Sequence, residues 1–250
     1  MDVNKYLNRI NYTGNTDPNP ENLLNLHKKH LFNVPFENLD IHGKKKIILN
    51  SELIEKKIID DKRGGYCYEL NGLFFLLLKQ LGFNVKMISA RVSSGNGNWG
   101  KEYDHLAILA EFDDLWLADV GFGDSFIEPL VIKPDVSQKN PNGWFIISGY
   151  ENGYLKLSKS SDNKTFTDEY IFTLKERSWN EFEEMNSYHQ TSPDSPFTKK
   201  KLCTIANENG RITLTDRKLI LTENQSKSTI EVEGEEDFRS KLFEYFGIRV

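Results

Sequence analysis

The sequence is short of cysteine, of net positive charge and of long apolar runs, and each shortage excludes a class of protein. Two widely separated cysteines in 250 residues form no disulfide framework and fit a reducing compartment. Neither has a partner at zinc spacing, and no histidine pair lies at ligand spacing on an apolar face, so we expect no metal site. A net charge of −5 without a dominant basic face argues against a nucleic-acid partner.

Apolar segments of membrane-spanning length are also missing. The first residues, Met1 to Tyr6, carry no apolar stretch of the kind found in secretory signals. No later window approaches the length of a membrane span, and there is no internal repeat or low-complexity linker. We therefore expect a soluble, cytoplasmic protein with no membrane partner, and its oligomeric state stays open.

The sequence does contain a clear change of periodicity along the chain. Residues 1–85 are predicted to be helical, with Pro35 ending one helix and Ser51 capping another. From residue 86, short alternating apolar runs are separated by Gly and Asn or Asp turns, which indicates a small barrel or sandwich. Further strands and a closing helix complete the chain. We expect an α+β fold: a helical bundle over 1–85, a β-barrel-like domain over 86–190 and an α/β lid over 191–250.

Cys67 follows a glycine pair and precedes apolar residues at helical spacing, which predicts a helix from near Tyr66 to near Leu81. The thiol falls in the first turn and on the apolar stripe. A helix N-terminus lowers a cysteine pKa, so we expect an activated thiol. The glycines would let a second backbone strand or a substrate carbonyl approach it. The alternative, a small buried hydrophobe, is the interpretation that we keep for Cys203.

A nucleophilic cysteine needs a base, and the histidines differ in their settings. His27 and His30 occupy a polar helical segment, and His42 precedes the solvated run Lys44–Lys46. We expect these three histidines to lie on the surface or to support the site from behind the reacting groups. His105 instead opens an apolar strand. We therefore expect His105 to be the base.

The strand that His105 opens turns at 112–114 and returns to Asp119. With a three-residue turn, Glu111 faces Leu115, and His105 lies one diagonal step from Asp119 on the same face of the hairpin. A two-residue turn would move Asp119 to the opposite face. Asp119 could otherwise simply end the strand and begin a turn.

Cysteine, histidine and aspartate in this order match a nucleophile, its base and an orienting carboxylate, which supports acyl transfer through a thioester on Cys67. The acyl acceptor stays open at this level. A cysteine hydrolase or a transglutaminase-type enzyme would use the same three residues. A non-enzymatic binding domain that retains an old cleft is a further alternative.

Four segments then resemble the arylamine N-acetyltransferases and span most of the chain: 30–39 with its Val-Pro-Phe-Glu-Asn-Leu, 63–71, His105 with 119–123, and 186–197 with its Thr-Ser-Pro-Asp-Ser-Pro-Phe. The architecture resembles the papain and transglutaminase class, with a Cys-His-Asp core. The family resemblance implies acetyl-coenzyme A as a co-substrate rather than a tightly bound cofactor. It further implies a two-step transfer of the acetyl group to the amine of an arylamine, hydrazine or arylhydroxylamine.

The same resemblance implies roles for individual residues. Cys67 would be the nucleophile, His105 the base and Asp119 the orienting acid. Coenzyme binding is implied for Gly121, Phe122 and Gly123, and acceptor binding for Phe36 and Phe122. From the residues alone, Gly121 and Gly123 could merely shape a turn. The runs Lys44–Lys46 and Lys199–Lys201 are solvated loops or attract the coenzyme phosphates, and the sequence leaves both open.

Overall fold

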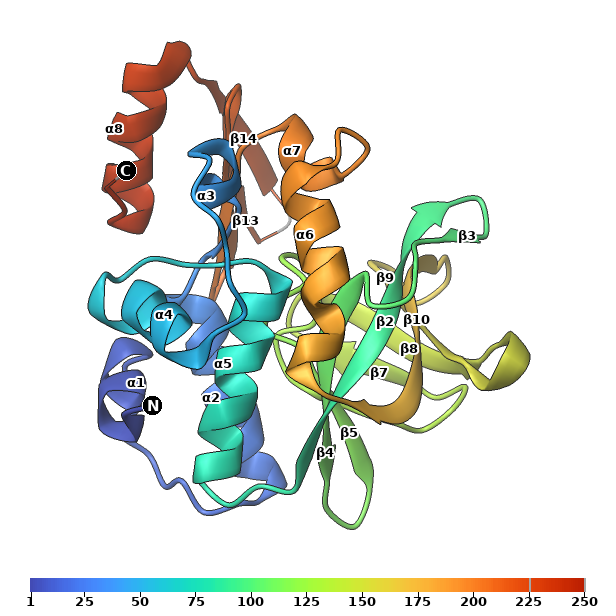
Figure 1. Ribbon diagram of the computed structural model, residues 1–250. Coiled ribbons are helices and arrows are strands. Elements are labelled where there is room, and N and C mark those ends of the chain that lie inside the picture. The colour runs from blue at the N-terminus through green and yellow to red at the C-terminus, as the bar shows by residue number, and fades with distance from the viewer. Residues whose placement is uncertain (225, 250) are drawn as a thin grey trace.

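Helices form the N-terminal part of the molecule, and strands form most of the remaining chain. The computed structural model describes residues 1–224 and 226–249. Figure 1 shows the early helices on one side and a large curved sheet on the other. The helices are α1 (Val3–Arg9), α2 (Pro20–Asn33), α3 (Leu39–His42), α4 (Ser51–Glu55) with the π-helical turn η1 (Lys56–Asp60), α5 (Cys67–Gln80), α6 (Glu183–Thr191), α7 (Pro196–Lys199) and α8 (Gly234–Phe246), with 3-10 turns η2 (Glu151–Gly153) and η3 (Trp179–Phe182).

The strands form two antiparallel sheets. The larger has nine strands in the order β6-β5-β4-β2-β10-β9-β8-β7, with β3 on β2. Its members are β2 (Val85–Gly95), β3 (Asn98–Trp99), β4 (His105–Glu111), β5 (Leu115–Ala118), β6 (Leu130–Val131), β7 (Ser137–Asn140), β8 (Gly143–Gly149), β9 (Leu155–Ser160) and β10 (Thr167–Arg177). The smaller runs in the order β1 (Phe36–Glu37), β11 (Leu202–Asn207), β12 (Gly210–Thr215), β13 (Lys218–Glu223) and β14 (Ser226–Glu231).

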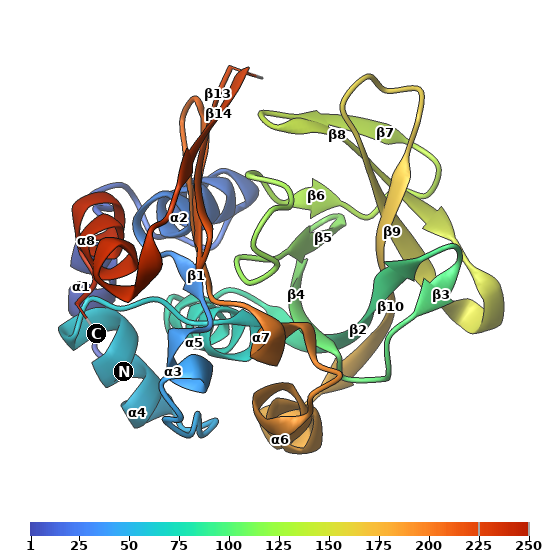
Figure 2. The same cartoon turned by 90° about the horizontal axis from the view of Figure 1, so that it is seen from above.

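The larger sheet curls into an almost closed barrel (Figure 2). Within the part of the chain that the structure describes, its edge strands β6 and β7 share no backbone ladder. The side-chain amide of Gln138 joins them instead. It donates to the carbonyl of Val131 at 2.8 Å and accepts from the Val131 N–H at 2.9 Å. The barrel interior is filled with apolar side chains, among them Leu109, Phe145 and Tyr170.

Helix α5 packs on the outside of the barrel, against β2 and β4. Strand alternation explains this arrangement: Leu106 and Ile108 join the cluster around α5, whereas Leu109 points into the barrel. Leu70 and Phe74 of α5 are fully buried in that cluster. The helix that carries Cys67 is therefore fixed against the strand that begins with His105.

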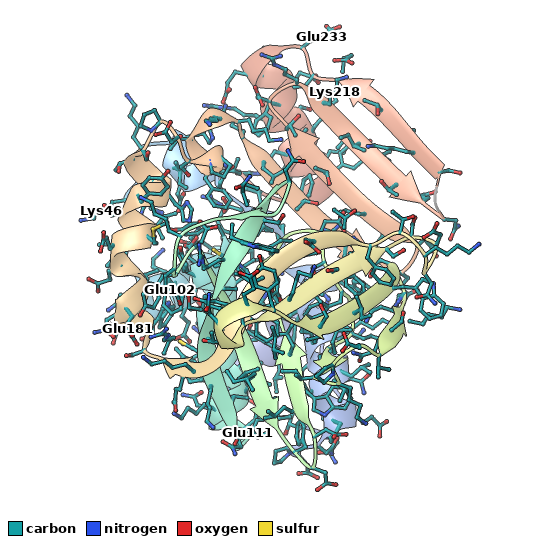
Figure 3. All side chains as sticks on the ribbon, turned by 90° about the vertical axis from the view of Figure 1, so that its right-hand side faces the viewer. Lys46, Glu102, Glu111, Glu181, Lys218 and Glu233 are labelled. Atoms are coloured by element: carbon teal, nitrogen blue, oxygen red, sulfur yellow. The ribbon has the colours of Figure 1, made fainter. Side chains whose placement is uncertain are left out.

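The smaller sheet is covered on one face by α8, through Phe238 and Leu242. Its first strand, β1, comes from the N-terminal part and pairs with Cys203 and Thr204 of β11. Figure 3 shows this sheet, with Lys218 and Glu233 labelled, at the end of the molecule away from Glu111.

The expected α+β architecture and the helix over 67–80 are confirmed. Two local expectations were wrong. Asn50, not Ser51, caps α4, accepting the N–H groups of Glu52 and Leu53 at 3.0 and 3.1 Å. The segment before residue 85 also contains strand β1, which pairs far along the chain and so left no local pattern. Among the described residues, no helix has the length and apolar character needed to cross a membrane.

Candidate active site

Cys67 is the first residue of α5 and is 2% exposed. The Tyr66 N–H before it donates to the carboxylate of Glu69 at 3.1 Å, which fixes the helix start. Gly64, the first of the two glycines before Cys67, lets another segment of backbone pack closely against this turn. A Cβ on Gly64 would lie 2.0 Å from the carbonyl oxygen of Pro35, so the chain before β1 packs directly against this turn.

A buried ionic cluster lies beneath this turn. Lys57 contacts Glu69 at 2.9 Å and Asp40 at 2.8 Å, and Arg63 contacts Glu37 at 2.7 Å. Burial lowers the pKa of Lys57, but the nearby carboxylates outweigh burial and raise it above its usual value. The cluster therefore links α3, η1 and β1 to the first turn of the Cys67 helix.

His105 and Asp119 meet through the β4–β5 hairpin. Glu111 pairs with Leu115, as the three-residue turn requires, so the predicted register is confirmed. The Nε2 of His105 lies 2.7 Å from Oδ2 of Asp119, and both residues are buried. Because a carboxylate accepts, Nε2 carries the proton and Nδ1 is left free to act as a base.

Asp119 stays ionised despite its burial. Burial raises its pKa, but His105 and hydrogen bonds from Asn71 and the Gly121 N–H bring the pKa below its usual value. The Asn71 amide donates to Asp119 at 2.8 Å, and the hydroxyl of Tyr170 donates at 3.1 Å. Asn71 and Tyr170 carried no signal for this role in the sequence, since their partner lies on a different element.

His27 supports Asp119 from behind, which is one of the two positions expected for it, and it is not on the surface. Both His27 and His30 are fully buried. The ring of His27 stacks on Phe126 with centroids 5.6 Å apart, and its Nε2 accepts the Asp119 N–H at 3.0 Å. Burial lowers the pKa of His27 to about 4, so the ring is neutral. Spacing with Leu23 and Leu26 on the buried stripe of α2 could have indicated this.

The expected direction of the Cys67 pKa was also wrong. Burial raises the pKa of this thiol, and the carboxylates of Asp104 and Asp119 raise it further. Hydrogen bonds from the backbone N–H groups of Tyr68 and Leu106 lower it by less. The position at the helix N-terminus therefore does not outweigh burial, and the pKa of the thiol lies above its usual value. Cys203 is fully buried, as expected of an ordinary core residue.

One cavity of about 580 Å³ joins these groups. Cys67 and His105 line it, and so do three of the residues singled out in the sequence: Phe36, Gly121 and Phe122. Gly123 does not line it but lies behind Phe36, where a Cβ would be 3.8 Å from the ring. The remaining residues of the cavity wall are Val92, Ser93, Ser94, Gly100, Lys101, Asp104, Met185, Tyr188, His189, Asp194, Pro196, Phe197 and Leu202.

Gly121 has a packing reason of its own. A Cβ there would lie 2.8 Å from Cα of Cys67 and 2.6 Å from the amide nitrogen of Asn71. Only glycine lets the segment after Asp119 run this close to α5. This close packing places Asp119, which contacts His105, beside α5, the helix that carries Cys67.

A second cavity, also of about 580 Å³, lies between the barrel and the smaller sheet. Lys159 and Arg211 line it and both contact Asp124, at 3.1 and 3.4 Å. The lysine run 199–201 lines neither cavity, and Lys201 pairs with Glu235. Within the described residues, no group of three or more His, Cys, Asp or Glu is arranged to hold a metal ion.

Comparison with known proteins gives the family. The model of a family described as N-acetyltransferase matches residues 20–250. The arylamine N-acetyltransferase of Escherichia coli (strain K12) is 32% identical over 217 residues, which cover 86% of this chain and 76% of that protein. This chain belongs to the arylamine N-acetyltransferase family. The hydrolase and transglutaminase alternatives are not favoured.

Solved structures of arylamine N-acetyltransferases share the fold. The enzyme from Salmonella typhimurium matches with a TM-score of 0.91 at 28% identity, covering 98% of this chain and 90% of that one. The Mycobacterium marinum enzyme, solved in complex with CoA, matches with a TM-score of 0.91 at 27% identity, covering 99% and 93%. The similarity therefore extends over the whole acetyltransferase fold.

Proposed function

We propose that Cys67 carries an acetyl group as a thioester between acetyl-coenzyme A and the amine of an arylamine, hydrazine or arylhydroxylamine. Membership of the arylamine N-acetyltransferase family supports acetyl-coenzyme A-dependent acetylation of arylamines. The observation that carries the finer proposal is that Cys67 lines one cavity with His105, whose Nε2 lies 2.7 Å from Asp119.

In the first half-reaction, Nδ1 of His105 takes the Cys67 proton, and Asp119 stabilises the resulting imidazolium. The thiolate attacks the acetyl carbon of acetyl-coenzyme A. When the tetrahedral intermediate collapses, the bond to the coenzyme sulfur breaks, and the imidazolium returns its proton to the departing thiolate. The products are acetyl-Cys67 and free coenzyme A.

In the second half-reaction, the acceptor nitrogen attacks the Cys67 thioester. His105 takes a proton from the attacking nitrogen, the carbon–sulfur bond breaks, and Cys67 leaves as a thiolate that is reprotonated. The product is the N-acetylated amine. Phe36 and Phe122, which line the cavity, provide apolar surface for an aromatic ring.

The coenzyme would extend from Cys67 along 121–123. The segment leads to Asp124 and the second cavity, where Lys159 and Arg211 provide cations suited to phosphates. A cytoplasmic location is part of this proposal, because both cysteines are free and Cys67 must stay reduced to act.

Acetyl-coenzyme A labelled in the acetyl group tests the proposal. In the absence of an amine, we expect one acetyl group per chain, located at Cys67 by peptide mass analysis. Cys67→Ser should take up none, and Cys203→Ser serves as the matched control with full labelling.

Initial rates with both substrates varied should give parallel double-reciprocal lines. Intersecting lines would indicate direct transfer in a ternary complex.

A further inference from the structure

A second histidine–carboxylate pair lines the cavity beside Cys67. Nε2 of His189, on α6, lies 3.2 Å from Oδ1 of Asp104 and 3.2 Å from its backbone carbonyl. The His189 side chain is 3% exposed, and that of Asp104 is 16% exposed. The pair is separate from His105 and Asp119, and neither half-reaction uses it.

The hydrogen-bond partners of His189 indicate which ring nitrogen carries a proton. Nε2 faces only acceptors on Asp104, so it carries a proton. Nδ1 lies 3.3 Å from the hydroxyl of Ser195, which donates to the backbone carbonyl of His189 at 3.1 Å. Both ring nitrogens of His189 therefore have a polar partner, and Nε2 holds the Asp104 side chain in place. Ser195 is fully buried and accepts the Phe197 N–H, so it helps to hold the wall and is no nucleophile.

Asp104 retains capacity for a ligand. His189 uses one lone pair of Oδ1, and the Val92 N–H uses one of Oδ2, at 3.2 Å. Oδ2 also packs against Gly100, where a Cβ would lie 2.0 Å from it, so the second lone pair of Oδ1 is the one left for a ligand in the cavity that Asp104 lines. Its charge acts on the thiol, because the Asp104 carboxylate raises the pKa of Cys67.

Two other charged residues line the cavity, besides the histidines, but they face solvent. Lys101 is exposed and lies over the ring of Tyr188, 4.7 Å from its centroid, and Asp194 is exposed too. Water and salt screen such charges. Of the charged side chains in the cavity wall, that of Asp104 is therefore the least exposed to solvent, and it should interact most strongly with an acceptor bound beside Cys67.

We propose that Asp104, positioned by His189, selects acceptors by charge: it binds an N–H donor on a neutral or cationic aromatic amine and disfavours aromatic amines that carry a carboxylate. The substrate class favoured is thus amines and acid hydrazides with a second N–H group near the ring. This inference rests on the proposed acetyl transfer and specifies its acceptor.

A competition experiment tests it. Wild-type enzyme with acetyl-coenzyme A receives equal amounts of 4-aminobenzamide and 4-aminobenzoate, which are close in shape but differ in charge and in N–H donors. Both compete for one acetyl-enzyme, so the ratio of their products is independent of the acylation rate. We expect the amide product to predominate. Asp104→Asn should shift the ratio toward the carboxylate product by about tenfold, the size of one charge interaction at moderate distance.

Glu102→Gln is the matched control. It removes the same charge two residues away, from a side chain that contacts Arg177 at 3.3 Å and does not line the cavity. Figure 3 shows Glu102 with Glu181 on one side of the molecule. The control should keep the wild-type ratio. A change as large as that of Asp104→Asn would mean a general charge effect and overturn the proposal.

His189 is tested as a positioning residue. His189→Gln can still donate to Asp104 and should keep most of the wild-type preference, whereas His189→Leu should lose it. Equal ratios of amide to carboxylate product in the two variants would show that His189 does not position Asp104. If wild-type enzyme acetylates neither amine, the proposed function itself fails. If it acetylates both but Asp104→Asn leaves their ratio unchanged, only the selection by Asp104 is overturned.

Discussion

The Cys67 thiol is surrounded by groups that oppose its ionisation. Burial and two carboxylates raise its pKa, and two backbone N–H groups compensate only in part. In the proposed mechanism, the thiolate forms as one half of an ion pair with protonated His105. The rate at which Cys67 reacts should therefore depend on the groups that stabilise the His105 imidazolium.

Asp119→Asn tests this dependence. The variant keeps a hydrogen-bonding group but removes the charge that stabilises the imidazolium 2.7 Å away. Alkylation of Cys67 by iodoacetamide should move to higher pH, toward about 8.5 or above, and acetyl transfer should fall roughly 10³-fold. The measurement is the alkylation rate as a function of pH.

Asp104→Asn should move the same profile in the opposite direction. Its carboxylate raises the pKa of Cys67, so its removal should lower the pH at which Cys67 is alkylated. If Asp104→Asn behaved like the loss of Asp119, the assignment of Asp119 as the orienting acid would be wrong.

His27 gives a pH dependence of stability. Its folded pKa of about 4 lies below the 6.5 of an unfolded histidine, so the unfolded chain binds the proton first. The free energy of unfolding should therefore decrease by about 3 kcal/mol as the pH falls from 6.5 to 4. Below pH 4, His27 should cause no further change in it. Urea unfolding across this range should show a shallower dependence for His27→Asn than for wild type.

Among the elements, the segment after β5 has little freedom, because it packs directly against α5. Gly121→Ala places a methyl group within 3 Å of Cys67 and Asn71 and should cost about 1–3 kcal/mol. Acetylation of Cys67 should slow as well. Gly149→Ala, where a Cβ meets nothing within 4 Å, should stay within about 0.5 kcal/mol of wild type. Equal stability and labelling of the two variants would contradict the packing role of Gly121.

Elements whose signals are local were predicted well. The helix over 67–80 follows from apolar spacing, and the β4–β5 register follows from the length of one turn. Strand β1 was missed because its partners in β11 are distant in sequence. The direction of the Cys67 pKa failed for a related reason, since burial depth is set by packing between elements. Asp104 and His189 meet only after α6 returns to the barrel.

At the scale of the whole molecule, the ionic cluster around Lys57 connects the early helices with the strand that begins the smaller sheet. Lys57→Met would leave three buried carboxylates with less compensation and should destabilise the protein by about 3–5 kcal/mol in urea unfolding. Lys56→Met is the control: its side chain is 65% exposed, and its pair with Asp61 should contribute less than about 1 kcal/mol. Similar losses in both variants would show that the cluster is not specifically stabilising.

Cys67 belongs to a helix, whereas His105 and Asp119 belong to the barrel against which that helix packs. Acetyl-enzyme formation is therefore a reporter of native docking between the two layers. A partly folded chain that has formed the helix but has not docked it would keep an unassisted thiol. During denaturation, labelling of Cys67 by acetyl-coenzyme A should accordingly disappear before the helical circular dichroism does.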